Sequence, residues 1–347
     1  MSKSFKDTLQ QLATAAKLHT SHLYILSRMD QTSLDIFKDV WPTIGIDRRR
    51  TIMQELLEIA EVNFEVDFDP VFLLAMGDPD AQVRATAIKS LWEYEKPSLI
   101  RPLIHLLKTD EVVIVREAAA SALGKFIYLK ELEEIDWNEA LLAEEALLEV
   151  IYQASEDIDV RRRAIEAIGY SSDSRIPQII EAAYFDDNEK MQVSAIFAMG
   201  RNADARWIPR VISELDNRQT ELRFEAARAC GELEAKDAVN RLVVLIDEDT
   251  DPEVQEMAIW ALGRIGGNTA REVLEACLES DNEALALAAE EALDELNLFG
   301  DSLMLYDFDE DDDSDADWIE LLDDDFDDDS SDFDGFNGQS KPKKYLH

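Results

Sequence analysis

The 347 residues carry a formal net charge of −42 and include only 12 glycines, 9 prolines and 2 cysteines. So few glycines and prolines argue against an all-β or low-complexity chain, and two cysteines are too few for a disulfide framework, which favours a reducing compartment. Because binding to phosphate backbones or anionic membranes depends on Lys and Arg, the acidic balance argues against direct contact with nucleic acid or a membrane.

Residues 1–31 have no uninterrupted apolar core of the signal-peptide type, and no apolar run of 18 residues occurs in the chain. We therefore expect a soluble, cytoplasmic protein that begins with capping helices. His19 and His22 could share a metal ion on one helix face, but no third ligand is suggested nearby, so we interpret them as a surface pair. We expect no metal ion and no cofactor.

Residues 32–298 predict repeated helix pairs. Seven segments align on an apolar anchor residue (position 0), an alanine at +4 and a large apolar residue at +8. These positions share one face of an α-helix, which predicts a buried face. The anchors follow one another at spacings of 32, 45, 31, 31, 32 and 31 residues: Val83, Val115, Val160, Met191, Leu222, Val254 and Leu285.

The other columns of the repeat predict how the helices meet. Alanine at +4 in all seven segments indicates close approach of stacked helices, and we interpret five glycines at +9 as helix stops: Gly124, Gly169, Gly200, Gly231 and Gly263. A second apolar segment lies between anchors, with Pro177 and Pro209 in its first turn. Each repeat is therefore two antiparallel helices, which must stack to bury their apolar faces.

The segments DPDAQVRATAIKSL and DPEVQEMAIWALGRIG resemble the short HEAT-like repeats first named in phycobilisome lyases, and the resemblance covers about residues 70–297. Residues 32–61 are interpreted as an earlier, divergent pair. We expect an all-α solenoid of about eight two-helix HEAT-like repeats with a period of about 31 residues. The resemblance implies that the second helix of each pair lines the concave face.

The single 45-residue spacing exceeds the period by about 14 residues, around Ile127–Trp137. This insertion is either a surface loop or a binding edge. A second irregular feature is a set of charges around the anchors, which predicts a structural ladder of ion pairs between neighbouring repeats. Its members are Arg84, Arg116, Arg161 and Arg223 at +1, and Asp78, Asp110, Asp186 and Asp249 at −5.

Positions +2 and +6 of the second helices form a stripe beside the buried face. The stripe holds Phe197, Phe224 and Trp260 in three consecutive repeats, and Arg162 in an earlier one. Because a few aromatic side chains carry most of the binding energy of an interface, we predict that these four residues bind a partner. The alternative is that the rings pack against neighbouring repeats.

Residues 299–347 form a predicted disordered acidic tail, since residues 301–334 hold 18 acidic residues and no Lys or Arg. Trp318, Leu321 and Leu322 lie at one-turn spacing and could bind a partner; the alternatives are that the tail raises solubility or masks the protein's own bases. Residues 1–300 are acidic as well, with 58 acidic and 31 basic residues. We therefore expect partner proteins with a basic or mixed surface, in an oligomeric state that the sequence leaves open.

Catalytic patterns are absent from the sequence: it has no glycine-rich phosphate loop, no GxSxG turn and no CxxC pair. Deoxyhypusine hydroxylases use similar repeats, but they build their iron site from His-Glu dipeptides, and this sequence has none. We expect a non-enzymatic interaction scaffold or adaptor that binds its partner on the concave face, with the tail modulating partner choice. The alternatives are a lyase-like or chaperone-lyase-like accessory, and a tail that mimics nucleic acid and binds a basic protein.

Overall fold

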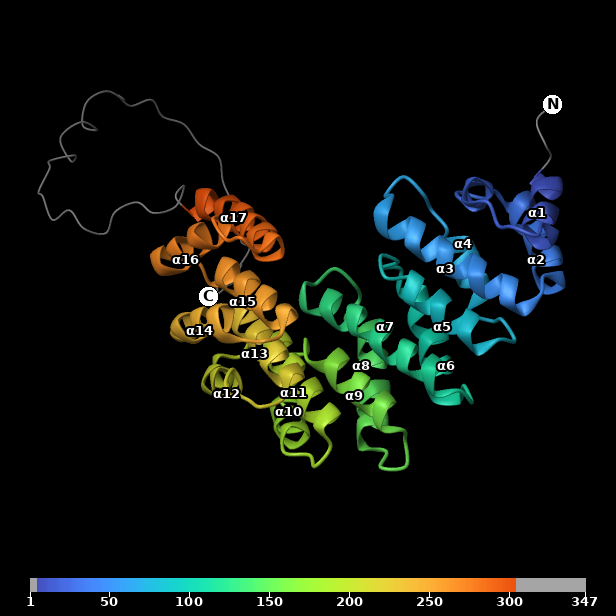
Figure 1. Cartoon of the computed structure of the whole chain (residues 1–347). Coiled ribbons are helices and arrows are strands. Elements are labelled where there is room, and N and C mark those ends of the chain that lie inside the picture. The colour runs from blue at the N-terminus through green and yellow to red at the C-terminus, as the bar shows by residue number, and fades with distance from the viewer. Residues whose placement is uncertain (1–4, 304–347) are drawn as a thin grey trace, which may run out of the picture. The chain divides into compact units, whose positions relative to one another are not determined.

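The computed structural model describes residues 5–303, and every regular element in that range is helical (Figure 1). The chain begins with α1 (Phe5–Thr14) and the 3-10 helix η1 (Thr20–Leu26). Eight helix pairs follow: α2 (Gln31–Val40) and α3 (Ile46–Val62); α4 (Asp69–Ala75) and α5 (Ala81–Ser90); α6 (Ile100–Thr109) and α7 (Val113–Glu131); α8 (Trp137–Tyr152) and α9 (Ile158–Ile168); α10 (Ile176–Tyr184) and α11 (Glu189–Arg201); α12 (Ile208–Glu214) and α13 (Thr220–Glu232); α14 (Val239–Glu248) and α15 (Pro252–Ile265); α16 (Asn268–Leu278) and α17 (Glu283–Leu303).

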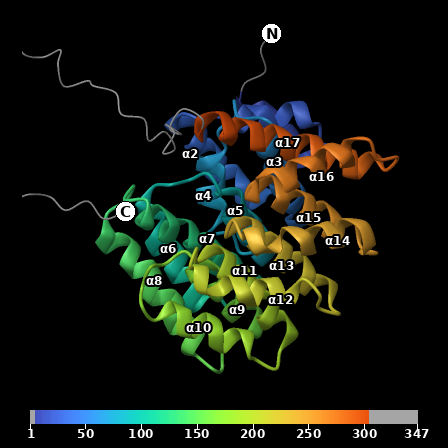
Figure 2. The same cartoon turned by 90° about the vertical axis from the view of Figure 1, so that its left-hand side faces the viewer.

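The pairs follow one another in chain order and form two layers (Figure 2). The second helices from α3 to α15 pack directly against one another in sequence, and first helices such as α6, α10 and α14 pack against the second helix of their own pair. Pro177 and Pro209 lie in the first turns of α10 and α12, where a missing N–H breaks no helical hydrogen bond. The fold is the all-α solenoid that the 31-residue period predicts.

Small residues set the distance between the second helices. The seven alanines at +4 are all fully buried, as their column predicts. The prediction that the glycines at +9 are helix stops holds for Gly169, which caps the end of α9. It is wrong for the other four, which lie inside α7, α11, α13 and α15. A Cβ atom built on Gly124 would lie 3.0 Å from the Cα atom of Ala167 in the next second helix. The glycine column is therefore required by close helix packing, because larger side chains would push the layers apart.

The predicted charge ladder forms at several turns. Arg84 binds Asp110 of the next repeat at 2.8 Å, and Arg223 binds Asp249 at 2.6 Å. Arg116 instead binds Glu156 at 2.7 Å. All four aspartates at −5 also accept a hydrogen bond from the backbone N–H two residues later, which fixes the turn between the helices. Each carboxylate thus orders its own turn. In three repeats it also binds an arginine of the preceding repeat, since Asp78 pairs with Arg49 of α3 at 3.1 Å.

The long spacing is mostly helix rather than loop. Its extra residues lengthen α7 and α8, and only residues 132–136 remain between them. Ile127 is fully buried, and Lys130 is buried in an ion pair with Glu144 while its ammonium lies 4.6 Å from the centre of the Trp137 ring. This insertion is therefore packed into the layers, while its short turn is mostly exposed.

Candidate protein-interaction surface

The four residues of the predicted stripe lie on α9, α11, α13 and α15, and all are half-buried. Trp260 covers Gly231 of the preceding repeat so closely that a Cβ atom built there would lie 2.7 Å from its Cζ3 atom. Phe224 packs against the hydrophobic core, and Arg162 binds Asp159 of its own helix at 2.7 Å. For Trp260 and Phe224 these contacts favour the alternative of packing within the stack.

Phe197 has a different environment, because two guanidinium groups lie over its ring. The central carbon of Arg228 is 3.7 Å from the ring centre and that of Arg201 is 5.2 Å away. Arg201 also lies 5.1 Å from the centre of the Tyr170 ring and donates a hydrogen bond to its hydroxyl group. Cation–π contacts of this kind strengthen when water is excluded. They join α11, α13 and the segment that follows α9 on one surface.

Tyr170 and Phe197 belong to a groove of about 310 Å³ that crosses α7, α9 and α11, which we call the second-helix groove. The ring of Tyr128 lies 5.0 Å from that of Tyr170, and the side chains of Tyr128 and Trp92 are 44% and 48% exposed. Exposed rings beside paired cations are typical of the residues that dominate binding interfaces. The other lining residues are Ser121, Gly124, Lys125, Arg163, Glu166 and Ala167.

Lys125 connects this groove to the end of α5. Its ammonium group donates hydrogen bonds to the carbonyl oxygens of Leu91 at 2.9 Å and Trp92 at 3.0 Å, which follow the last turn of that helix. A cation is favourable there, because the last carbonyls of a helix have no helical partners. Burial lowers the pKa of Lys125 to about 8, although nearby carboxylates such as Glu95 oppose this shift.

Carboxylates hold in place the two arginines that lie over the Phe197 ring. Glu232 accepts a hydrogen bond from Arg228 at 3.2 Å and pairs with Arg201 at 3.2 Å, and Glu225 accepts from Arg228 at 2.7 Å. Burial raises the pKa of the Glu225 carboxyl group, and it also raises the pKa of the Tyr170 hydroxyl group. Because these partners fix the guanidinium planes, the surface is ordered before anything binds to it.

The described residues hold few of the features that metal binding or a reactive thiol requires. Between residues 5 and 303, no three His, Cys, Asp or Glu side chains are placed to hold a metal ion. Burial raises the pKa of the Cys230 thiol to about 12 and also raises that of Cys277, whereas a reactive thiol needs a lowered pKa. In the same range, no helix combines the length and the apolar character that crossing a membrane requires.

Comparison with known families agrees with the helix pairs. The sequence matches the family of HEAT repeats over residues 69–142 and 208–294, which include α4 to α7 and α12 to α16. The chain is a HEAT-like repeat protein. A search of curated proteins gave no match.

Solved structures similar to this HEAT-like repeat protein share its helical architecture. Yeast importin-beta is 12% identical with a TM-score of 0.48, over 84% of this chain and 46% of that one. The complex of CpcE and CpcF of phycocyanin lyase from Nostoc is 18% identical with a TM-score of 0.43, over 66% and 94%. Human deoxyhypusine hydroxylase is 16% identical with a TM-score of 0.35, over 85% and 96%. At such identities and TM-scores the likeness supports no conclusion about what this chain does.

The sequence-based search missed most of the second-helix groove of this HEAT-like repeat protein. A signal was present at +10, where residues 31 apart pair across repeats: Arg201 with Tyr170 and Glu232, and Arg264 with Glu295 at 3.0 Å. The predicted tail residues, Trp318, Leu321 and Leu322, lie outside the described residues.

Proposed function

We propose that this HEAT-like repeat protein is a non-enzymatic scaffold or adaptor that binds a partner protein in the second-helix groove. The observation that carries the proposal is the pair of nearly half-exposed rings, Trp92 and Tyr128, in a groove that also holds Phe197, over which two arginines lie. Isolated exposed rings are common on protein surfaces, but rings that line a shared groove gain more from being covered by a partner. Of the predicted stripe, Phe197 contributes directly to this surface.

The charges of the groove indicate a partner with a mixed surface. Lys125 and Arg163 lie in the same groove as Glu166, and Arg163 binds Glu166 at 2.6 Å. A partner of uniform charge would meet like charges somewhere along the groove, and such contacts cost affinity. A partner with aromatic or apolar anchors and scattered polar groups meets this arrangement better.

The test replaces the two exposed rings. In Trp92→Ala/Tyr128→Ala we expect partners captured from native lysate by the wild-type protein to be lost, and the affinity of a purified partner to fall more than about tenfold. The matched control is Tyr152→Ala/Phe185→Ala, which removes two rings exposed outside the groove. Equal losses in both variants, or retained binding in the groove variant, would refute the proposal.

We further propose that residues 299–347 tune which partners bind. Their acidic composition raises the encounter rate of basic proteins and lowers that of acidic ones. Replacing Trp318, Leu321 and Leu322 with alanine should change the affinity ranking of captured partners while the groove still binds. An unchanged ranking at low and at physiological ionic strength would show that these three residues have no such role.

A further inference from the structure

A second groove lies in the layer of first helices, between α4 and α6, with a volume of about 490 Å³. We call it the first-helix groove. Its wall is mostly apolar, and Leu73 is 38% exposed there. Arg84 also lines it, but Asp110 balances this charge at 2.8 Å. The apolar lining residues are Leu73, Met76, Leu99, Pro102 and Leu106, together with the ring of Tyr94.

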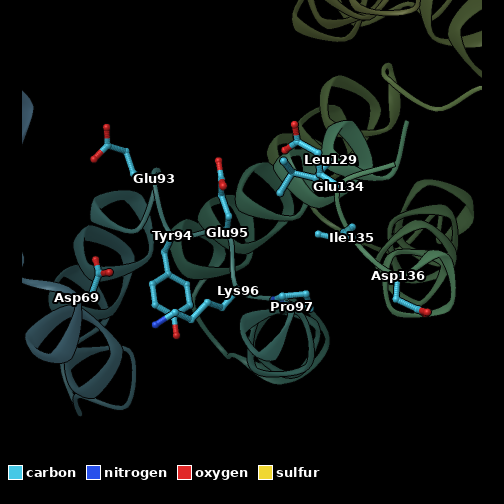
Figure 3. A pocket seen from close by; sticks show the side chains of 10 residues that line it. All are labelled: Asp69, Glu93, Tyr94, Glu95, Lys96, Pro97, Leu129, Glu134, Ile135 and Asp136. Carbon is cyan, nitrogen blue, oxygen red and sulfur yellow. The ribbon is translucent and has the colours of Figure 1, made fainter. Parts of the chain in front are cut away.

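Tyr94 also lines a neighbouring hollow of about 590 Å³, which we call the acidic hollow. Figure 3 shows its carboxylates on two sides: Asp69 lies on one side, Glu134 and Asp136 lie on the other, and the loop of residues 93–97 runs between them. Its five acidic residues are Asp69, Glu93, Glu95, Glu134 and Asp136, and Lys96 is the only basic residue among the ten that line it.

One wall of the acidic hollow comes from the insertion. Glu134, Ile135 and Asp136 belong to the short turn between α7 and α8, which exists because this repeat is longer than the others. Asp136 also accepts a hydrogen bond from the backbone N–H of Asn138 at 2.9 Å and so begins α8. The turn is therefore ordered by its own capping residue and holds its carboxylates in place.

Lys96 shows which chemistry the hollow accommodates. Its ammonium group lies 5.3 Å from the centre of the Tyr94 ring, a cation–π contact. Burial, together with the charges of Asp67 and Glu93, raises the pKa of Asp69, and the charge of Lys96 opposes that shift. The charge of Lys125 opposes the shift of the Asp69 pKa as well, but two ammonium groups do not balance five carboxylates. The hollow therefore keeps a negative potential that attracts further cations.

We propose that the first-helix groove and the acidic hollow together bind a basic amphipathic segment of a partner protein. Apolar side chains of the segment rest on Leu73 and the Tyr94 ring, and a neighbouring Lys or Arg enters between Glu93 and Glu134. Charge complementarity favours this occupant, because the carboxylates repel an acidic segment. A purely hydrophilic polycation would gain no apolar contacts with the wall of the first-helix groove. The surface shares no lining residue with the second-helix groove, so this proposal does not depend on the function proposed above.

The probe is a short fluorescent amphipathic peptide of Leu and Lys, whose binding to the full chain is followed by anisotropy at physiological ionic strength. Two companion peptides carry Glu in place of every Lys, or Ser in place of every Leu. We expect the Leu-Lys peptide to bind at least about tenfold more tightly than either companion, because both the charge and the apolar face contribute. Equal binding of the Ser-Lys peptide, or tighter binding of the Leu-Glu peptide, would overturn the proposal.

Because the chain is acidic throughout, general attraction of a cation must be separated from binding at this site. Glu93→Lys/Glu134→Lys reverses two charges of the acidic hollow, and Glu272→Lys/Glu275→Lys makes the same change of net charge at exposed positions of α16. We expect the first pair of substitutions to lower the affinity for the Leu-Lys peptide about tenfold, and the second pair to lower it less than about twofold. Similar losses in both pairs would show that the peptide binds by net charge alone.

The apolar part of the site has its own matched pair. Leu73→Ser removes an exposed leucine of the first-helix groove, and Leu278→Ser removes a leucine of similar exposure, 43%, at the end of α16. Helical circular dichroism and melting temperature show whether each variant remains folded. We expect only Leu73→Ser to lower the affinity for the Leu-Lys peptide, by about fivefold or more. An unchanged affinity in that folded variant contradicts the proposal.

Discussion

The guanidinium carbon of Arg228 lies 3.7 Å from the centre of the Phe197 ring, on the neighbouring second helix. The same guanidinium group donates hydrogen bonds to Glu225 at 2.7 Å and Glu232 at 3.2 Å. A single cation therefore covers an aromatic ring and balances two carboxylates that burial disfavours. This contact makes the stability of the stack depend on a residue of the proposed binding surface.

Replacing this cation should destabilise the protein. In Arg228→Ala, Glu225 remains largely buried without its partner and Glu232 keeps only Arg201, so we expect the free energy of unfolding to fall by about 2 to 3 kcal/mol. Arg206→Ala is the control, because Arg206 pairs with Asp204 at 2.6 Å at an exposed turn, where such a pair contributes less than about 1 kcal/mol. Urea unfolding measures both, and similar small losses would mean that Arg228 has no special role.

A methyl group added to the glycine column should also be destabilising. In most helix interiors Gly→Ala stabilises by about 1 kcal/mol, but in Gly124→Ala the new Cβ atom would lie 3.0 Å from both the Cα and the Cβ atoms of Ala167. We expect a loss of about 1 to 3 kcal/mol, because α7 and α9 must move apart. At Gly45 a Cβ atom would meet nothing within 4 Å, so Gly45→Ala should change stability by less than about 1 kcal/mol. A more stable Gly124→Ala protein would contradict this account of the column.

The helix pairs could be predicted from the sequence because the same residue types recur at the same positions of each repeat. The buried alanines at +4, the Pro entries and the Arg84 to Asp110 pair all follow from columns of aligned residues. Four of the five glycines were misinterpreted because a helix end and a close helix contact both favour glycine. Only the position of Gly124 inside α7, against Ala167, distinguishes the two.

The binding surfaces were harder to predict, for two physical reasons. The second-helix groove depends on Trp92 and Tyr128, and Tyr128 belongs to the lengthened part of α7, which has no counterpart in the other repeats. The acidic hollow combines Asp69 with Glu93 and Glu134, which belong to different helix pairs and to turns of irregular length. Periodicity predicts contacts at a fixed separation, whereas these contacts arise where the period is broken.

The two cysteines should report on different openings of the structure. Cys230 is fully buried with a pKa of about 12, whereas Cys277 is partly exposed. We expect iodoacetamide at pH 8 to modify Cys277 much faster, because Cys230 becomes accessible only when the layers open. In urea the two rates should become similar. Fast modification of Cys230 in Cys277→Ser without denaturant would show that α13 is less tightly packed than the structure indicates.

Lys125 predicts how stability depends on pH. The unfolded chain keeps its proton up to about pH 10.5, the ordinary value for lysine, whereas the folded chain loses it near pH 8, because burial lowers the pKa of Lys125. Between these values the unfolded state binds more protons, so the contribution of Lys125 to the free energy of unfolding rises with pH. The protein remains strongly negative over this range, which keeps it away from its pI of about 4.2.

Lys125→Met removes this titration. The free energy of unfolding of the wild type should therefore rise relative to that of Lys125→Met between pH 8 and 10.5. The difference between the two proteins should be constant between pH 6 and 7, where Lys125 is charged in both states. Urea unfolding at several pH values measures this difference, and Lys89→Met gives the effect of losing an exposed lysine of α5. If the wild-type and Lys125→Met curves run parallel across the whole range, the ammonium group at the end of α5 is not desolvated, and the second-helix groove is more open to water at that end than the burial of Lys125 implies.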